Sequence, residues 1–176
     1  MKKKILIIPL AVFLLIISTF FYLLLIDRNP SEIPSNLLNK NVPNFEAKLL
    51  FKNKDFLSSK EFGNEKVLVN FFATWCKPCR DEHIFIKRFS DEKKIRVIGI
   101  NYKDDPNKTI KWLNKFGNPY SNVPLDKNGR IAIEWGVYGI PETFVVDSNG
   151  IIKYRLAGPI TNETFKKINL VIEESN

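Results

Sequence analysis

Hydrophobic and polar positions divide this chain into an apolar N-terminal segment and a longer region of short apolar runs. Residues 5–26 carry no charge and follow Lys2, Lys3 and Lys4. A helix of this length and composition spans a bilayer. The segment ends in aromatic and branched residues without an A-x-A pattern, which favours a retained anchor over a cleaved signal peptide. The lysines predict a cytoplasmic N-terminus, with the rest of the chain across the membrane.

Residues 27–44 separate the apolar segment from the rest of the chain. Pro30, Pro34 and Pro43 stand there among Asn and Ser, a composition typical of a tether. The remaining length fits one domain of ordinary size. We therefore predict an anchor over residues 1–26, a tether over 27–44 and a folded domain over 45–176.

Beyond the tether, strand-like and helix-like patterns alternate. Strands are predicted over 45–51, 67–73, 96–102, 143–146 and 151–156, and helices over 58–62, 76–90, 106–116, 130–135 and from Thr161 or Asn162 to Glu173. Asp105 is a candidate cap for the helix that begins at Pro106. Units of β-α-β followed by a hairpin and a terminal helix predict an α/β fold with a central mixed sheet and helices on both faces.

The charge of the chain changes this picture little. The 176 residues carry a formal net charge of +8. After the N-terminal lysines the basic residues are scattered, which indicates a solvated surface. We predict no nucleic-acid function.

The only two cysteines stand in the run Trp75-Cys76-Lys77-Pro78-Cys79, directly after a predicted strand. Cys76 is thereby placed at the start of a helix. Free N–H groups and the helix dipole favour the thiolate there, and the thiolate is the species that attacks disulfides. The spacing predicts a redox-active disulfide.

Three other uses of this cysteine pair are disfavoured. A closed zinc site needs four ligands, and the chain adds only His83 to the two thiols. Covalent attachment of haem c needs a histidine where this chain has Arg80. Structural disulfides of small secreted domains usually close longer loops and occur in several pairs. We expect no metal and no organic cofactor.

Four motifs carry a resemblance to known families. The run Phe72–Arg80 resembles the active site of the thioredoxin superfamily. The remaining three are similar to the membrane-anchored cytochrome c maturation thiol-disulfide oxidoreductases, known as the CcmG or DsbE family. They are C-R-D-E-H at 79–83, G-I-N-Y-K-D-D at 99–105 and G-V-Y-G-I-P-E-T-F at 136–144. The resemblance implies a thioredoxin-like fold behind an N-terminal transmembrane helix.

The resemblance also implies roles for the residues at the motifs. Cys76 would attack a partner disulfide and Cys79 would resolve the mixed disulfide, an order that the helix position of Cys76 supports. Pro141 matches a proline that is cis in this superfamily and faces the dithiol. A trans proline that only breaks the chain before a strand is the alternative.

Two glutamates and a tryptophan complete the expected site. Glu82 matches the acidic residue that marks this family's active site, where a carboxylate would disfavour the thiolate of the buried cysteine and could relay its proton. Glu142 would line the substrate groove, and Trp75 would shield the dithiol from water. The alternative for Glu82 is an ordinary exposed glutamate in the first helical turn, and for Glu142 it is a charge at the start of a strand. His83 is given no chemistry and is expected to bond a backbone group or to lie on the surface.

Together these features predict a protein-disulfide reductase of cytochrome c biogenesis. It would be a single-pass protein of the bacterial inner membrane with its domain in the periplasm. Its substrate would be apocytochrome c or a maturation component, and a membrane thiol reductase would supply electrons. A general periplasmic reductase and a non-catalytic apocytochrome-binding module are the alternatives, and the Lys77-Pro78 pair leaves an oxidising role open.

Overall fold

A computed structural model of the chain describes residues 2–25, 36–51 and 55–175. The chain divides into two compact units, the N-terminal helix and the remainder. Helix α1 (Lys2–Leu25) includes the stretch Ile7–Leu25, whose mean hydropathy is 2.6. By length and composition this helix can cross a membrane. Residues 1 and 26 of the predicted anchor and residues 27–35 of the predicted tether lie outside the described residues.

The larger unit is built on a five-stranded sheet of order β5-β4-β3-β6-β7. The strands are β3 (Val67–Phe72), β4 (Arg96–Tyr102), β5 (Leu125–Asp126), β6 (Glu142–Val146) and β7 (Ile152–Ala157). β3, β4 and β5 are parallel, whereas β6 runs antiparallel to both β3 and β7. The predicted mixed sheet is therefore confirmed. A separate antiparallel pair joins β1 (Glu46–Lys48) to β2 (Phe56–Ser58).

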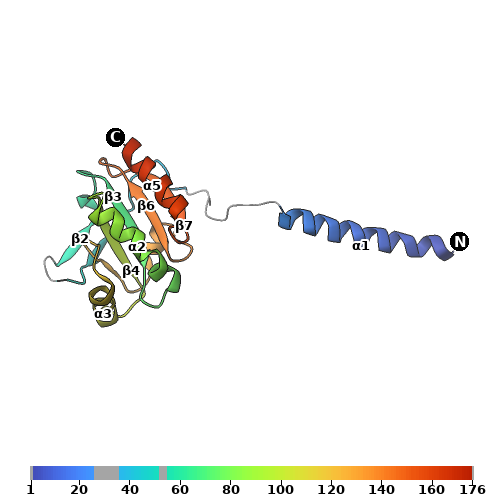
Figure 1. The fold of residues 1–176 in the computed structure, drawn as a ribbon, viewed down its shortest axis with the longest axis horizontal. Coiled ribbons are helices and arrows are strands. Elements are labelled where there is room, and N and C mark those ends of the chain that lie inside the picture. The colour runs from blue at the N-terminus through green and yellow to red at the C-terminus, as the bar shows by residue number, and fades with distance from the viewer. Residues whose placement is uncertain (1, 26–35, 52–54, 176) are drawn as a thin grey trace. The chain divides into compact units, whose positions relative to one another are not determined.

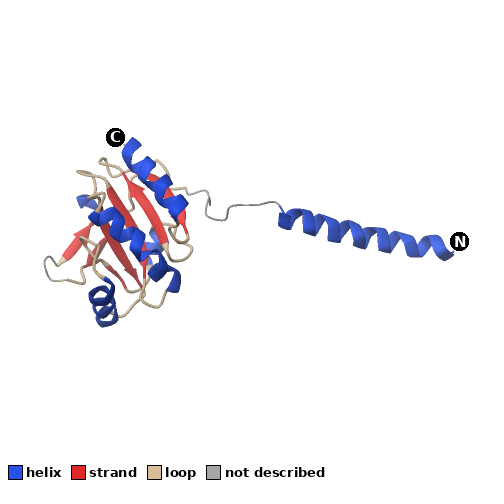
Figure 2. Ribbon diagram, viewed as in Figure 1, coloured by secondary structure: helices blue, strands red, loops and turns tan. Residues whose placement is uncertain are grey.

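Helices cover both faces of the sheet, as predicted (Figures 1 and 2). They are α2 (Lys77–Asp91), α3 (Pro106–Phe116), α4 (Arg130–Glu134) and α5 (Asn162–Glu174), with a 3-10 turn η1 at Ser59–Glu61. Since strand residues alternate between faces, Leu68 and Phe72 of β3 pack in the core under α2, α3 and α5. Val67, Val69 and Phe71 pack in the core shared with α4 and the β1-β2 pair.

Local signals explain where several elements begin and end. Asp105 caps α3 by accepting a hydrogen bond from the Lys108 N–H at 2.9 Å, and α3 ends before Gly117, whose φ is 90°. Thr161 caps α5. The helix predicted over 58–62 is wrong in part, because Ser58 ends β2 and only Ser59–Glu61 turn as η1. The short strands β2 and β5 were not predicted.

Residues 39–42, which the sequence assigns to the tether, bond to the first residue of β7 and to the loop before it. The Asn39 N–H donates to the Ile152 carbonyl at 2.8 Å, and the Val42 N–H donates to the Gly150 carbonyl at 2.9 Å. The Ile152 N–H donates in turn to the Lys40 carbonyl at 2.9 Å. The folded unit therefore includes residues before position 45.

Candidate active site

The Cys76–Cys79 disulfide lies where β3 gives way to α2. The two sulfur atoms are 2.06 Å apart and the Cα atoms 5.3 Å apart. Cys76 is the N-cap of α2, and its Sγ accepts a hydrogen bond from the Cys79 N–H at 3.1 Å. Pro78 lies in the first turn, where a missing N–H costs little. An electron-rich sulfur at position 76 is thus stabilised by the helix N-terminus.

The loop before β6 brings the G-V-Y-G-I-P-E-T-F motif to the disulfide. The Ile140–Pro141 peptide bond is cis. The Ile140 carbonyl oxygen lies 3.7 Å from Cys76 Sγ. The cis-proline loop and the start of α2 therefore meet at Cys76 Sγ, although they are more than sixty positions apart in the sequence.

Glu82, one turn after Cys79 on α2, is buried on the sheet side of the helix. Its side chain is 1% exposed, so the alternative of an exposed glutamate is wrong. Asn70 Nδ2 donates to Glu82 Oε1 at 2.8 Å, and the Ile160 N–H donates to Oε2 at 2.8 Å. Burial raises the pKa of Glu82 to about 8, although these two bonds favour the carboxylate.

Asn70 connects Glu82 to a second buried residue, Tyr120, which the sequence analysis did not select. The Tyr120 hydroxyl donates to Asn70 Oδ1 at 3.0 Å. The Tyr120 ring packs directly against Gly99 of β4, where an added Cβ would lie 2.6 Å from the ring. Burial, and then the charge of Glu82, raise the pKa of Tyr120 well above its usual value, so the hydroxyl stays protonated and donates.

Glu142 lies on the opposite face of the sheet and does not line an open groove. It is 1% exposed and pairs with Arg155, whose Nε donates to Glu142 Oε2 at 3.0 Å. Glu142 Oε1 also accepts the Tyr138 N–H at 2.9 Å. The placement follows from the alternation of β6, which points position 142 to the same side as Phe144. Burial raises the pKa of Glu142, and Arg155 opposes that rise.

Trp75 and His83 differ strongly in exposure. The Trp75 side chain is 59% exposed beside the disulfide, and its Nε1–H donates to the Lys103 carbonyl at 3.3 Å. His83 is buried, and its Nε2 bonds the Gly117 carbonyl at 2.9 Å, which is one of the two expected outcomes. Burial lowers the pKa of His83.

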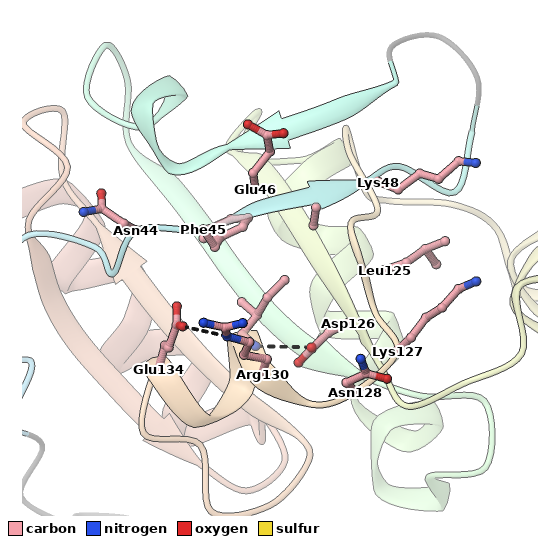
Figure 3. Close-up of a pocket in the computed structure, with 12 residues that line it drawn as sticks. Asn44, Phe45, Glu46, Lys48, Leu125, Asp126, Lys127, Asn128, Arg130 and Glu134 are labelled. Atoms are coloured by element: carbon pink, nitrogen blue, oxygen red, sulfur yellow. Dashed lines mark hydrogen bonds and ion pairs between the residues drawn. The ribbon is translucent and has the colours of Figure 1, made fainter.

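A separate hollow of about 530 Å³ lies between β1 and α4 (Figure 3). Three of its polar side chains already have partners, since Asp126 accepts the N–H groups of Ile131 and Ala132, and Arg130 pairs with Glu134 at 3.4 Å. None of the predicted site residues lines it. Within the described ranges, no cluster of three His, Cys, Asp or Glu side chains could hold a metal ion.

Glu82 is expected to make the stability of the oxidised protein fall as the pH rises from 4.5 towards 8. The unfolded carboxyl loses its proton near the usual pKa of 4.5, whereas the folded carboxyl keeps its proton to about 8. Between these values the folded state holds one more proton, so this group lowers the free energy of unfolding by about 1.4 kcal/mol per pH unit. Glu82→Gln should remove this contribution, as urea unfolding at several pH values will measure.

The matched control is Glu92→Gln, which alters an exposed carboxylate at the other end of α2. This variant should keep the slope of the parent protein. His83 also titrates in this range, because burial lowers its pKa from 6.5. Subtracting the free energy of unfolding of Glu82→Gln from that of the parent at each pH cancels this contribution. Parallel curves for the parent and Glu82→Gln between pH 6.5 and 8 would contradict the raised pKa.

Comparisons with known proteins agree with this geometry. Residues 37–172 match the Redoxin family. The thiol:disulfide interchange protein DsbE of Escherichia coli is 40% identical over 171 residues, covering 95% of this chain and 92% of that protein. The thiol:disulfide interchange protein CycY of Rhizobium leguminosarum is 39% identical over 140 residues, covering 80% of this chain and 75% of that protein.

Solved structures support the fold independently. A thiol:disulfide interchange protein of the thioredoxin family from Chlorobium tepidum has a TM-score of 0.63 at 20% identity and covers 81% of this chain and 99% of its own. A secreted disulfide oxidoreductase of Mycobacterium tuberculosis has a TM-score of 0.62 at 15% identity and covers 73% and 94%. Together with the Cys76–Cys79 pair, these matches show a disulfide oxidoreductase. The chain therefore belongs to the DsbE family of thiol:disulfide interchange proteins, with a Redoxin domain and a thioredoxin-like fold.

Proposed function

We propose that this chain is a membrane-anchored protein-disulfide reductase of cytochrome c biogenesis, facing the periplasm from a bacterial inner membrane. The observation that carries the proposal is a redox-active pair at a helix N-terminus, in a chain that matches a DsbE protein over 95% of its length. Residues 1–26 would be the anchor and 45–176 the main part of the catalytic domain. Of the segment 27–44 between them, residues 39–42 bond to that domain, so the tether would end before them. The apolar stretch Ile7–Leu25 supports the anchor by its length and hydropathy.

The chemistry of haem attachment explains why such a reductase is needed. Covalent attachment uses both thiols of a C-x-x-C-H motif, whereas the periplasm is kept oxidising. A disulfide formed there, in apocytochrome c or in a maturation partner bound to it, must be reduced before haem can be attached. This chain would supply the two electrons.

Reduction would proceed in two exchange steps. The Cys76 thiolate attacks one sulfur of the partner disulfide, which forms a bond between Cys76 and the partner and releases the partner's other sulfur as a thiolate. Cys79, as a thiolate, then attacks Cys76 Sγ and releases the second partner thiol. The partner gains two electrons and two protons, and this chain is left with the Cys76–Cys79 disulfide. That oxidised pair is the state seen in the structure.

Glu82 would serve the second step. Cys79 is buried and must lose its proton before it can attack. A carboxyl one turn away, with a pKa raised to about 8, can both take up and return a proton near neutral pH. Trp75 and the segment ending at Pro141 would provide the exposed surface that the partner meets. A membrane thiol reductase would then restore the dithiol.

A trapping experiment tests the proposal. Cys79→Ala is expressed in the native host, where Cys76 can attack but the mixed disulfide has no internal thiol to resolve it. Mass spectrometry then identifies the bound proteins. The double variant Cys76→Ala, Cys79→Ala is the matched control, because it keeps the fold and the surface but cannot form an adduct.

We expect the trapped proteins to be apocytochromes c or components of cytochrome c maturation. A broad set of unrelated periplasmic proteins would instead establish a general reductase and reject the dedicated role. Equal recovery of a partner by the double variant would show binding without exchange. Cytochrome c maturation that persists in a strain carrying only the double variant, without added reductant, would reject the catalytic role.

A further inference from the structure

Asp104, in the loop between β4 and α3, bonds to the segment that immediately precedes Cys76. Its Oδ2 accepts the Thr74 backbone N–H at 2.5 Å, and its Oδ1 accepts the Thr74 hydroxyl at 3.0 Å. Thr74 lies in the turn closed by the Cys76 N–H, which donates to the Ala73 carbonyl at 3.2 Å. One carboxylate therefore fixes both the main chain and the side chain of the turn that leads into α2.

The carboxylate of Asp104 is itself held in place by β4 and α3. Asn101 Nδ2 donates to Asp104 Oδ2 at 3.3 Å, and the Asp105 N–H donates to Oδ1 at 2.8 Å. Asn101 is 1% exposed, and its Oδ1 accepts the Thr109 hydroxyl at 3.1 Å. The position of Asp104 is thus set by neighbours that do not belong to the dithiol segment.

Lys103 makes a second connection to the same turn. Its φ is +44°, a left-handed conformation that is uncommon for a residue other than glycine. Its carbonyl accepts the Trp75 Nε1–H at 3.3 Å, and its own N–H donates to the Asp126 carbonyl at 3.0 Å. Residues 103 and 104 together hold Thr74 and Trp75, the two residues before the attacking thiol.

We propose that Asp104 is a positioning residue for thiol exchange: through Thr74 it keeps the Cys76 sulfur at the N-terminus of α2 when the disulfide is open. The disulfide no longer restrains Cys76 in the reduced protein. The bond from the Cys79 N–H to Cys76 Sγ, 3.1 Å in the oxidised protein, then depends on the turn at 73–76. This inference rests on the proposed role of Cys76 as the attacking thiolate.

The direction in which the reaction rate of Cys76 changes distinguishes a loss of positioning from a loss of negative charge. Loss of a negative charge in this loop would by itself favour the Cys76 thiolate and speed its reactions. Loss of the turn would do the opposite, because the thiolate would no longer be held at the N–H groups that stabilise it. A slower reaction in a folded Asp104 variant therefore cannot be explained by the loss of charge and supports the loss of the turn.

The experiment measures alkylation of the reduced, full-length protein by iodoacetamide as a function of pH. The Cys76 thiolate displaces iodide and forms a carbon–sulfur bond, so the rate reports the reactive thiolate. Asp104→Ala should react about tenfold more slowly near neutral pH, with the midpoint of its pH profile moved upward. Asp105→Ala removes the same charge one residue away, where the carboxylate bonds only to α3, and should stay within about twofold of the parent.

Two further variants keep the test decisive if Asp104→Ala does not fold. Thr74→Val removes the hydroxyl bond to Asp104 and keeps the backbone bond, so it should react more slowly than the parent. Thr74→Ser retains both bonds and should restore the parental rate. Unchanged or faster alkylation in Asp104→Ala, or in Thr74→Val if only that variant folds, would overturn the proposal. Peptide mapping of the alkylated cysteine shows separately whether Cys76 is the reactive thiol.

Discussion

Cys76→Ser will lose disulfide exchange almost entirely, whereas Cys79→Ser will keep the first half of the reaction. A serine hydroxyl does not attack a disulfide. Both cysteines are buried, at 5% and 2% exposed, but only Cys76 is the N-cap of α2, where the helix N-terminus stabilises its thiolate. We expect the rate with a small aromatic disulfide to fall by about 10³-fold or more in Cys76→Ser. The measurement is the burst of coloured thiolate released by the reduced protein.

The number of thiolates released separates the two cysteines. The reduced parent should release two equivalents, because Cys79 resolves the adduct that Cys76 forms. Cys79→Ser should release one equivalent and retain the reagent on Cys76. Thiol titration of the unfolded proteins controls for the content of free cysteine. Fast release by Cys76→Ser together with slow release by Cys79→Ser would reverse the assignment of the attacking and resolving thiols.

Much of the fold follows from local signals in the sequence. The apolar run at 96–102 gives β4 with the predicted limits, and α3 has the predicted cap at Asp105 and the predicted end before Gly117. These features depend on residues within one or two turns of each other. The strands β2 and β5 have only three and two residues. They form because a partner strand is present, so no local sequence pattern predicts them.

The site was predictable only where its chemistry is local. Cys76 and Cys79 are identified by their spacing, and Glu82 follows from a resemblance. Asn70 and Tyr120 are fifty positions apart and meet only after the sheet has formed. The local signal for Asn70 was a polar residue within an apolar run, which is typical of a buried side chain with a polar partner.

The assignment of Glu142 to the substrate groove failed for a physical reason. Neighbouring positions on a strand point to opposite faces, so adjacency to Pro141 does not place the side chain beside the dithiol. Its partner Arg155 lies on β7, diagonal to Glu142 in the register that pairs Phe144 with Arg155. Predicting the pair of Glu142 and Arg155 requires the register between β6 and β7. That register includes an irregularity between Val145 and Val146.

Arg155→Met is expected to lower the free energy of unfolding by about 3–5 kcal/mol, because it leaves a buried carboxylate without its partner. The side chains of Arg155 and Glu142 are only 4% and 2% exposed, and their closest atoms are 2.9 Å apart. The loss should shrink at acidic pH, where Glu142 is protonated in both the folded and unfolded states. Urea unfolding at neutral and acidic pH provides the measurement.

Two variants test whether the cause is the unpaired charge. Arg130→Met breaks an ion pair whose side chains are 86% and 36% exposed, and should cost less than about 1 kcal/mol. The double variant Glu142→Gln, Arg155→Met removes the buried charge and should recover most of the stability. A loss in Arg155→Met as small as that in Arg130→Met would show that the pair contributes little.

The same pair connects stability to the active site. Arg155 Nη2 donates to the Gly136 carbonyl at 2.9 Å, and Glu142 accepts the Tyr138 N–H, so together they hold the segment that leads to Ile140. The Ile140 carbonyl lies at Cys76 Sγ. Arg155→Met, assayed under conditions where it remains folded, should therefore exchange thiols with a protein disulfide more slowly, while its reaction with a small reagent changes less. Equal slowing with both substrates would place the effect on the cysteines and not on this segment.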